Sequence, residues 1–543
     1  MRNFKIFFDS FNIWSIVITS LIAIPPFVVF GFIFLDSEVW NHLKETVLSD
    51  YIINSLLLVF GVATLSAIFG VLSAWFTTMY EFRGRKTLEW MLVLPLAIPP
   101  FIVGYTYAGI LDYSGIVQST IREVFEFSSK RDYYFPDIMS LGGAILVISF
   151  VLYPYVYLIV KASFINNSSK LIEVGQTFGL NLTKSFFKIA LPLARVAIVG
   201  SVSLVVMEAF NNYGTVHYYG VDTFSTGIFR VWFGMGDSIS AGKLASILMI
   251  FIFLMLFLER LSRAKLKFTT KHEHFQSKRY RPSSKLSGFF IFLVCALPVF
   301  FGFIAPMLQL IFWSLDSLYV LFTTEYLELI TNTFSIAFVA SFIGVFLAFF
   351  IAFNGYRSSH WISSIVTRVA TLGYAVPGAV IAVGVMLPFA FVDNSFDSFM
   401  REYFNISTGL LLSGTFFALI FGYIVRFLPV AFNSIDSGFS KLSKNLYEVS
   451  TSLGYSKFKT LYKIYLPLLK PSLLTAMILI FIDILKELPA TLILRPFNFD
   501  TLATRAYELA SNEMMPESAI YSLSIIIMGL IPVLFLVKNM AKR

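Results

Sequence analysis

The sequence is poor in cysteine and in charged residues. Of its 543 residues one is Cys, and only 13% are charged, against roughly 25% in soluble proteins. Because Cys295 has no partner in the chain, the sequence excludes both a disulfide framework and a thiolate metal site. The shortage of charge, with 57% hydrophobic residues and a mean hydropathy of +0.78, excludes an ordinary soluble protein.

Two further absences concern enzyme chemistry. No G-x-x-x-x-G-K-[ST] motif occurs, and the only Gly-Lys pair, Gly242-Lys243, is followed by Leu244. An integral-membrane enzyme would need a catalytic cluster, and no such pattern links the five histidines, His42, His217, His272, His274 and His360. His272 and His274, with Glu273, offer a metal site in a basic segment, although a solvated linker is the favoured interpretation.

Long apolar runs are abundant. A helix needs roughly 20 mostly apolar residues to cross the hydrocarbon of a bilayer, because lipid offers the backbone no hydrogen-bond partners. We predict an all-α integral membrane protein with about twelve spans, at residues 13–35, 52–79, 88–110, 139–160, 194–214, 241–258, 287–313, 329–353, 364–391, 409–431, 471–493 and 518–537. A cleaved signal peptide at Met1 to Leu35 is disfavoured, since no small-residue cleavage site follows that apolar run.

The basic residues predict how these spans are oriented. With the N-terminus inside, the cytoplasmic segments collect 30 Lys or Arg and the opposite loops collect 8. Cytoplasmic loops carry such an excess in membrane proteins. We therefore expect a multi-pass protein with both termini in the cytoplasm, and lipid topology rather than nucleic acid explains the net charge of +9.

The sequence repeats itself. A shift of 275 residues aligns EVGQTFGLNLTKSFFKIALPL, from Glu173, with EVSTSLGYSKFKTLYKIYLPL, from Glu448, without a gap. The same shift pairs Arg230 with Arg505, and a shift of 278 pairs earlier residues. We predict a first repeat at 1–260, a basic cytoplasmic linker at 261–286 and a second repeat at 287–543. Six spans in each half give two parallel repeats, related by a pseudo-twofold axis along the membrane normal.

Each half has a polar, patterned stretch of roughly thirty residues between its fourth and fifth spans. A glutamate, a glycine and a proline recur at the same spacing in both copies, as Glu173, Gly179 and Pro192 and as Glu448, Gly454 and Pro467. The pattern predicts a short amphipathic helix, a turn that glycine permits, and a second helix. The apolar side chains expected at its surface, which call for a partner, are Phe178, Leu180, Phe186 and Phe187.

At these residues the chain resembles the permease subunits of ABC importers. Both copies match the spacing of that family's EAA loop and depart from it at the Ala pair, which is Val174-Gly175 here and Val449-Ser450 in the second copy. The resemblance implies that the two stretches are coupling loops, in which Glu173, Gly179, Pro192, Glu448, Gly454 and Pro467 form the element that docks on an ATPase. Since this chain has no P-loop, we expect two copies of a separate ATPase, which bind ATP and Mg²⁺, and no cofactor on this chain.

Two stretches, Met207 to Gly234 and Asp483 to Ala510, resemble the fused, two-repeat permeases for ferric iron. That resemblance covers the whole chain and implies a periplasmic iron-binding protein as partner, in the inner membrane of a bacterium. Ionisable residues deep in spans mark transport pathways by default. Expected pathway residues are Glu208, Asp483, Lys486 and Glu487, with Lys486 close enough to Asp483 to neutralise it. Expected docking charges for the binding protein are Asp222, Arg230, Arg495, Asp500 and Arg505.

Other interpretations remain open. ABC permeases for thiamine, phosphonates or polyamines share the coupling loop, and a secondary transporter would also span the membrane repeatedly. For each ionisable residue in a span, a structural ion pair or an interfacial charge competes with a role in transport. For each loop charge, simple solvation is an equal alternative.

Overall fold

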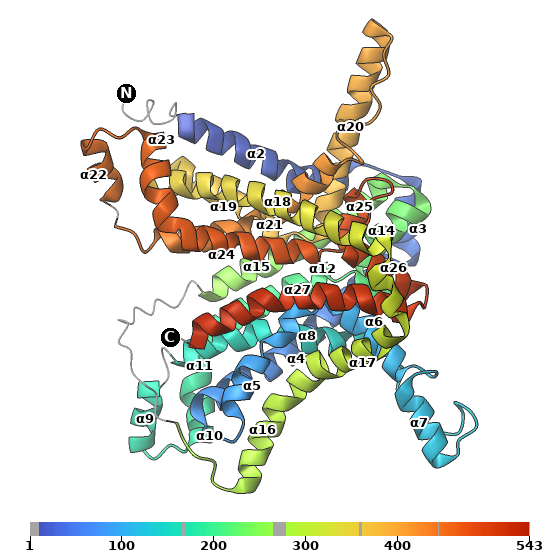
Figure 1. Ribbon diagram of the computed structural model, residues 1–543, viewed down its shortest axis with the longest axis vertical. Coiled ribbons are helices and arrows are strands. Elements are labelled where there is room, and N and C mark those ends of the chain that lie inside the picture. Colours follow the sequence, from blue (N-terminus) through green and yellow to red (C-terminus); the bar gives the residue numbers. More distant parts are fainter. Residues whose placement is uncertain (1–9, 166–168, 264–278, 358–360, 444, 542–543) are drawn as a thin grey trace. The chain divides into compact units, whose positions relative to one another are not determined.

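The protein is built from helices. The computed structural model describes residues 10–165, 169–263, 279–357, 361–443 and 445–541, and no strand occurs in these ranges (Figure 1). Two compact units are formed, each from three separate stretches of chain. Because a backbone in lipid must satisfy its own hydrogen bonds, the helical content agrees with the predicted all-α membrane class.

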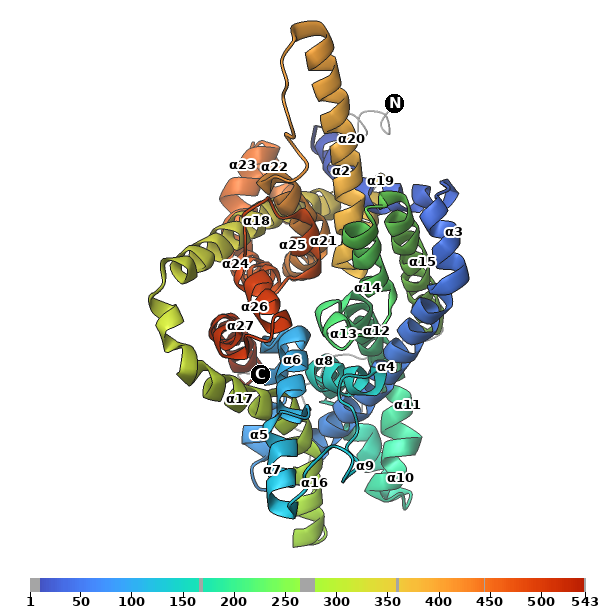
Figure 2. The same ribbon diagram turned by 90° about the vertical axis from the view of Figure 1, so that its right-hand side faces the viewer.

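The first unit comprises Met1–His42, Ile228–Met249 and Phe322–Arg505. Its main helices are α2 (Ser10–Gly31), α18 (Thr324–Arg357), α19 (Trp361–Ala370), α20 (Gly378–Phe404), α21 (Phe416–Phe439), α22 (Leu446–Ser452), α23 (Lys457–Thr460), α24 (Leu466–Leu485) and α25 (Pro489–Leu494), with parts of α3 (Glu38–Thr46), α15 (Ser238–Arg263) and α26 (Leu502–Ser511). Helix α21 packs against both α18 and α24. The outer end of α20 extends beyond its neighbours (Figures 1 and 2).

The second unit comprises Leu43–Gly227, Ile250–Leu321 and Ala506–Arg543. Its main helices are α4 (Leu48–Met79), α5 (Arg85–Met91), α6 (Pro100–Leu111), α7 (Ile116–Phe125), α8 (Leu141–Ser163), α9 (Ser169–Thr177), α10 (Leu182–Ser185), α11 (Leu191–Leu193), α12 (Arg195–Asn211), α13 (Gly214–Tyr218), α14 (Phe224–Phe229), α16 (Lys285–Val299), α17 (Ala305–Ser314) and α27 (Met515–Ala541). Helix α4 packs most extensively against α8.

The compact units exchange helices between the two halves of the sequence. The first helix of the chain, α2, packs on α20, α19 and α18 of the second half. Conversely, α16 and α17 of the second half pack on α4 and α6 of the first, and α27 packs on α17. Each unit is therefore completed by helices from the other half of the sequence.

Between nine and eleven segments of the described chain are long and apolar enough to cross a membrane. Nine are single helices, and two more are pairs of helices bent by 96° and 69°. The last predicted span corresponds to α27, whose apolar part, Met515–Ile531, is shorter than the others. The chain is thus a multi-pass membrane protein.

Two predicted spans, 88–110 and 364–391, are not continuous helices. In the first, a 3-10 turn at Leu94–Ala97 precedes Pro99, and α6 starts at the next residue. In the second, a 3-10 turn at Gly373–Ala375 precedes Pro377, and α20 starts at the next residue. Both prolines have extended backbone angles, with ψ of 138° and 148°. Proline has no amide to donate and disfavours helix in the residue before it, so the helix is interrupted there.

The contact between α2 and α20 depends on a glycine, and this generates a prediction. A Cβ on Gly384 would lie 2.5 Å from the Pro25 carbonyl oxygen, whereas a Cβ on Gly344 would meet nothing closer than 3.6 Å. Gly384→Ala should therefore destabilise the protein by about 1–3 kcal/mol through overpacking. Gly344→Ala, the matched control in another membrane helix, should not. Thermal unfolding in detergent measures both, and equal midpoints would contradict the close packing of α2.

Candidate functional site

The first coupling loop contains a short helix that ends at its glycine. Helix α9 stops where Gly179 adopts a φ of 81°. The Gly179 amide donates to the Gln176 carbonyl at 2.9 Å, and the Leu180 amide donates to the Gly175 carbonyl at 3.1 Å. This pair of bonds is the Schellman motif, which satisfies the last carbonyls of a helix and needs a residue with positive φ.

The second coupling loop ends its helix in the same way. Helix α22 stops at Gly454, whose φ is 77°. The Gly454 amide donates to the Thr451 carbonyl at 3.0 Å, and the Tyr455 amide donates to the Ser450 carbonyl at 3.1 Å. The predicted helix and glycine turn are therefore present in both copies, with equivalent hydrogen bonds.

A second helix follows each turn. The side chains of Asn181 and Ser456, one residue before α10 and α23, accept hydrogen bonds from the backbone amides three residues later, at 2.8 and 3.3 Å. Each helix then widens into a π turn, at Phe186–Ala190 and Leu461–Tyr465. Pro192 and Pro467 lie directly after these turns, in the first turn of α11 and α24. Ala190 and Tyr465, just before α11 and α24, still have helical backbone angles, so each proline lies in a helix that continues from the π turn.

The two positions after the glutamate explain how this chain departs from the Ala pair. Val174 and Val449 are exposed, so their larger side chains meet no neighbour that limits their size. Gly175 is buried, and a Cβ on it would lie 2.5 Å from Ile189 Cδ1. Ser450 is also buried. Only the second position must therefore be small.

Apolar side chains line the surface of both loops. Phe178 is 82% exposed, and the other exposed apolar or aromatic side chains are Phe187, Leu453, Phe458 and Tyr462. The prediction that Phe186 is exposed was wrong, because its ring packs against Trp75 with 5.0 Å between centroids. Leu180 is half-buried.

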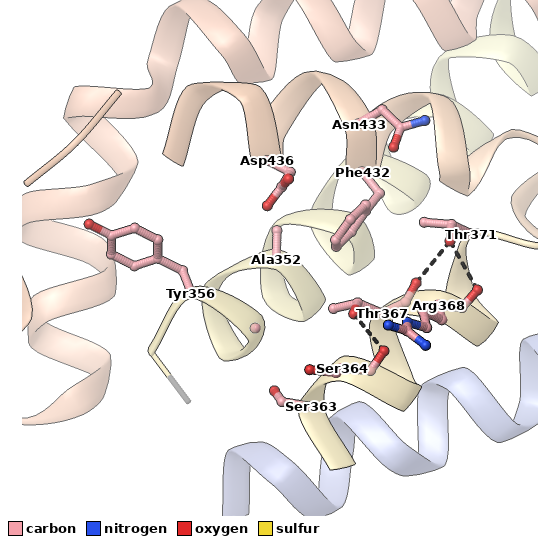
Figure 3. A pocket seen from close by; sticks show the side chains of 11 residues that line it. Ala352, Tyr356, Ser363, Ser364, Thr367, Arg368, Thr371, Phe432, Asn433 and Asp436 are labelled. Atoms are coloured by element: carbon pink, nitrogen blue, oxygen red, sulfur yellow. Dashed lines mark hydrogen bonds between the residues drawn. The ribbon is translucent and has the colours of Figure 1, made fainter. Parts of the chain in front are cut away.

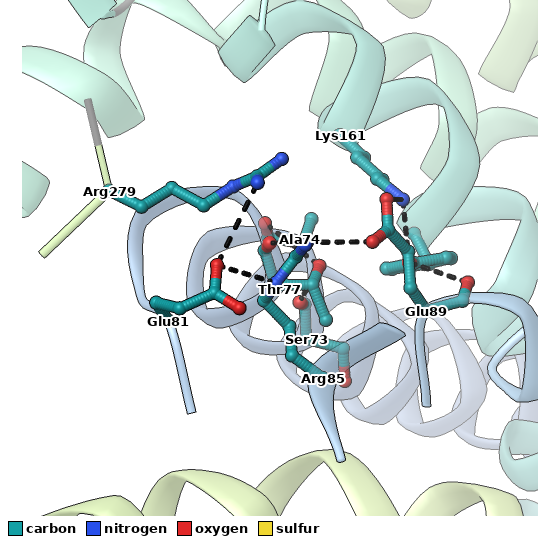
Figure 4. A network of polar contacts seen from close by, with 9 residues as sticks. Ser73, Ala74, Thr77, Glu81, Arg85, Glu89, Lys161 and Arg279 are labelled. Atoms are coloured by element: carbon teal, nitrogen blue, oxygen red, sulfur yellow. Dashed lines mark hydrogen bonds and ion pairs between the residues drawn. The ribbon is translucent and has the colours of Figure 1, made fainter. Parts of the chain in front are cut away.

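A network of ion pairs lies beside the first coupling loop in the second unit (Figure 4). Arg85 contacts Glu81 at 3.1 Å and Glu89 at 2.7 Å, and Lys161 contacts the other oxygen of Glu89 at 2.6 Å. Arg279 reaches Glu81 at 3.7 Å. Arg85 and Lys161 are buried, so the two carboxylates compensate charges that would otherwise be costly.

The end of the linker between the halves is attached to the first coupling loop. The Tyr280 hydroxyl donates to Gln176 Oε1 of α9 at 2.8 Å. The Tyr280 amide donates to the Met79 carbonyl at 2.8 Å, and its carbonyl accepts from the Glu81 amide at 3.0 Å. Burial, and then the negative charge of Glu173, raise the pKa of Tyr280. Glu173 itself is exposed on α9.

The second coupling loop is attached differently. The Tyr356 hydroxyl, at the end of α18, lies 2.7 Å from the Ser443 carbonyl and 3.2 Å from the Leu442 carbonyl. Glu448 is exposed on α22, as Glu173 is on α9. The two loops thus share their internal structure but are held by different neighbours.

Two of the predicted pathway residues form an ion pair. Lys486 Nζ lies 2.9 Å from Asp483 Oδ1, and both side chains are partly exposed at the end of α24. Glu208, the repeat equivalent of Asp483, is half-buried on α12 in the second unit. The predicted neutralisation of Asp483 by Lys486 is present in the structure, whereas the role of these groups in transport stays a prediction.

Glu487 belongs to a different arrangement. It is buried and pairs with Arg426 of α21 at 3.3 Å, and its Oε1 also accepts from the Ala490 amide at 3.0 Å. A Cβ on Gly378 would lie 2.3 Å from Arg426 and 2.5 Å from Glu487, so the start of α20 packs directly against this ion pair. Sequence reasoning missed Arg426 as a partner, although a lone arginine in an apolar span is a signal for one.

Three of the predicted docking charges are paired within the chain. Arg495 forms an ion pair with Asp500, and Arg505 contacts Glu325 at 2.8 Å. Arg230 is exposed at the start of a π turn, Arg230–Met235, and Asp222 is half-buried.

In each half, a backbone amide that follows the fifth predicted span donates to a side chain of the second predicted span of that half. The Phe224 amide donates to Ser55 Oγ at 3.0 Å, and the Leu502 amide donates to Thr333 Oγ1 at 2.9 Å. Leu502 lies 278 residues after Phe224, and Thr333 lies 278 residues after Ser55. The true offset between the halves in this region is therefore 278, not 275.

This offset overturns a predicted equivalence. Arg230 corresponds to Glu508, and Arg505 corresponds to Gly227, so the two arginines are not counterparts. The reason is that the second half has three more residues between Ala490 and Thr501 than the first half has between Thr215 and Thr223, and a gapless alignment cannot register this difference.

His272, His274 and Glu273 lie outside the described residues. In the part of the chain that the structure describes, no three His, Cys, Asp or Glu side chains converge as a metal site would require. Cys295 is buried in α16.

The chain matches the family described as "Binding-protein-dependent transport system inner membrane component" over residues 66–266 and 340–543. It therefore belongs to that family, whose members are membrane subunits of transport systems. The two matched stretches fall one in each half, and each includes a coupling loop.

Two permeases for ferric iron are similar over most of the chain, and a sulfate permease is similar over part of it. The Fe(3+)-transport system permease protein FbpB 2 of Haemophilus influenzae is 25% identical, aligned over 97% of this chain and 98% of its own. The ferric transport system permease protein FbpB of Actinobacillus pleuropneumoniae is 25% identical over 91% of this chain and 72% of its own. The sulfate transport system permease protein CysT of Salmonella typhimurium is 28% identical over 30% of this chain and 55% of its own.

The two glycine turns generate a prediction. A β-branched side chain at φ near 80° is strained by about 1–3 kcal/mol at each site, so Gly179→Val with Gly454→Val should displace both coupling helices. ATP-driven uptake by the reconstituted complex should fall to background while the chain still inserts into the membrane. Gly409→Val, at a positive φ in another loop, is the control. Full uptake by the double variant would contradict the role of the turns.

The buried ion pair generates a second prediction. Arg426→Gln leaves Glu487 buried without its partner and should destabilise the protein by about 3–5 kcal/mol. Adding Glu487→Gln should recover much of that loss. Lys486→Gln removes the more exposed pair and should cost about 0–1 kcal/mol. Thermal unfolding of the four proteins measures the difference, and equal effects of Arg426→Gln and Lys486→Gln would refute it.

Proposed function

We propose that this protein is the membrane-spanning permease of an ATP-driven importer that moves ferric iron into the cytoplasm. The observation that carries the proposal is the alignment with a Fe(3+)-transport permease over 97% of this chain. Fe(III) is a hard cation that favours oxygen ligands, and the carboxylates of Glu208 and Asp483 fit its passage. Recognition of the metal is left to the binding protein.

The architecture that we propose for transport is twelve spans in two parallel repeats. The paired coupling loops support it, since each compact unit contains one of them with the same caps and turns. The pseudo-twofold axis lies along the membrane normal, with the pathway between the halves. The excess of basic residues in alternate loops supports cytoplasmic termini and an inner bacterial membrane.

The partners follow from the coupling loops. Two copies of an ATPase, which bind ATP and Mg²⁺, each receive one loop through exposed apolar residues such as Phe178 and Leu453. Closure of the ATPase pair draws the loops together and opens the pathway outward. This chain binds no cofactor. A periplasmic iron-binding protein docks on the outer loops, where Arg230 is the exposed charge of the predicted set.

The deciding experiment is uptake by the reconstituted complex of permease, ATPase and binding protein. We expect ATP-dependent uptake of radiolabelled iron(III) by the wild-type complex. No uptake should occur with an ATPase that binds but does not hydrolyse ATP. Thiamine, phosphonate, a polyamine and sulfate are tested in parallel, because related permeases serve sulfate and the coupling loop is shared. If one of these compounds is taken up and iron is not, that compound and not iron is the substrate. Uptake that needs no ATP hydrolysis would point to a secondary transporter.

A further inference from the structure

The site of the ion-pair network has a counterpart in the second half of the chain. Residues of the first half from Ser55 to Pro99 correspond to residues 278 positions later, from Thr333 to Pro377. The offset of 275 begins with the helix caps Ser140 and Thr415. Under these offsets three charged residues of the network correspond to smaller or oppositely charged ones: Arg85 to Ser363, Glu89 to Thr367 and Lys161 to Asp436.

In the second half this site is a cavity. It has a volume of about 350 Å³ and lies among the ends of α18, α19 and α21 (Figure 3). Ser363, Thr367 and Asp436 all line it, as does Phe432, the counterpart of Tyr157. The space that Arg85, Glu89 and Lys161 fill in one half is therefore left open in the other, since hydroxyls and a short carboxylate replace long side chains.

The cavity carries both signs of charge, on opposite walls. Arg368 lies on α19 with Ser364 and Thr367, Thr371 follows that helix, and Asp436 lies across from them on α21 (Figure 3). Within the described ranges neither Arg368 nor Asp436 has an ion-pair partner. An occupant of this cavity therefore needs an anionic group for the α19 wall and a cationic group for Asp436.

The cavity lies at the ends of two candidate membrane spans. Besides α19, the helices that line it are the C-terminal parts of these spans, α18 and α21. Next to it, Trp361 and Ile365 of α19 are exposed to the surroundings. Tryptophan is enriched where spans meet the headgroup layer, and an amphipathic helix with exposed apolar residues suits that layer.

We propose that this cavity binds the ethanolamine phosphate ester group of a phospholipid. The phosphate accepts hydrogen bonds from Arg368 and from the hydroxyl of Ser364, and the ammonium pairs with Asp436. Charge-assisted bonds of this kind are the strong ones in proteins. The same chemistry is carried by a soluble ester such as glycerophosphoethanolamine, but the position of the cavity at the end of the spans favours the lipid.

The cavity is also lined by Tyr356, the residue that holds the second coupling loop. The Tyr356 hydroxyl bonds to the Leu442 and Ser443 carbonyls, just before α22. The lipid headgroup thus supports the second coupling loop as the charged network supports the neighbourhood of the first. Binding itself does not rest on the proposed function, because it requires neither ATP nor a transported substrate.

The test measures which lipid the purified full chain retains. Native mass spectrometry of wild type extracted from membranes with phosphatidylethanolamine and phosphatidylglycerol should show bound phosphatidylethanolamine. The triple substitution Ser363→Arg, Thr367→Glu and Asp436→Lys installs the residues of the first half and should reduce that retention about tenfold. Arg368→Gln and Asp436→Asn, which each remove one charge, should each weaken it.

Arg401→Gln, an exposed charge in the same unit, is the control and should retain lipid as wild type does. In nanodiscs without phosphatidylethanolamine, soluble glycerophosphoethanolamine is then titrated and thermal stabilisation measured. Stabilisation of wild type but not of Asp436→Asn by the soluble ester would assign the chemistry to a free ester. Stabilisation by phosphatidylethanolamine alone would assign it to the lipid. Equal retention by wild type, the single variants and the triple variant would overturn the proposal, as would equal retention of phosphatidylglycerol and phosphatidylethanolamine.

Discussion

Every backbone amide and carbonyl of this chain that enters the hydrocarbon must find its hydrogen-bond partner inside the protein, and the structure is organised by that constraint. Within a helix the backbone groups bond to one another, so amides and carbonyls need other partners only where a helix is interrupted. At two such interruptions a side chain replaces the missing helical partner: Asn212 accepts from the Thr215 amide, and Glu487 accepts from the Ala490 amide. Glu487 is charged and buried, and Arg426 neutralises it. One interrupted helix therefore accounts for an ion pair deep in the first unit.

The coupling loops are exposed, and a different constraint shapes them. Each must present a short helix with apolar side chains while it remains joined to the spans. The Schellman turns at Gly179 and Gly454 fix the loop internally in the same way. The attachment differs, through Tyr280 to α9 in one half and through Tyr356 to the start of the loop in the other. Duplication thus preserved the element that faces a partner, while its support diverged.

The exchange of helices between the halves means that each unit with a coupling loop is built from both halves of the sequence. Helix α2, from the start of the chain, packs in the unit that contains the second loop. Helices α16 and α17, from the second half, pack in the unit that contains the first. A movement of either unit therefore carries helices of both halves. The fused chain suits this arrangement, since the linker keeps both halves in one polypeptide.

The sequence by itself determined the helical membrane class, most of the spans and the two coupling loops, because apolar length and the spacing of glycine and proline are local properties. The tertiary structure alone decided the exchange of helices, the partner of Glu487 and the burial of Phe186, because each depends on residues distant in the chain. It also decided that Arg230 and Arg505 are not counterparts. Two residues of a repeat are equivalent when they make the same contacts in their own halves. A loop that is longer in one half changes which residues make those contacts, and a gapless alignment does not show the change.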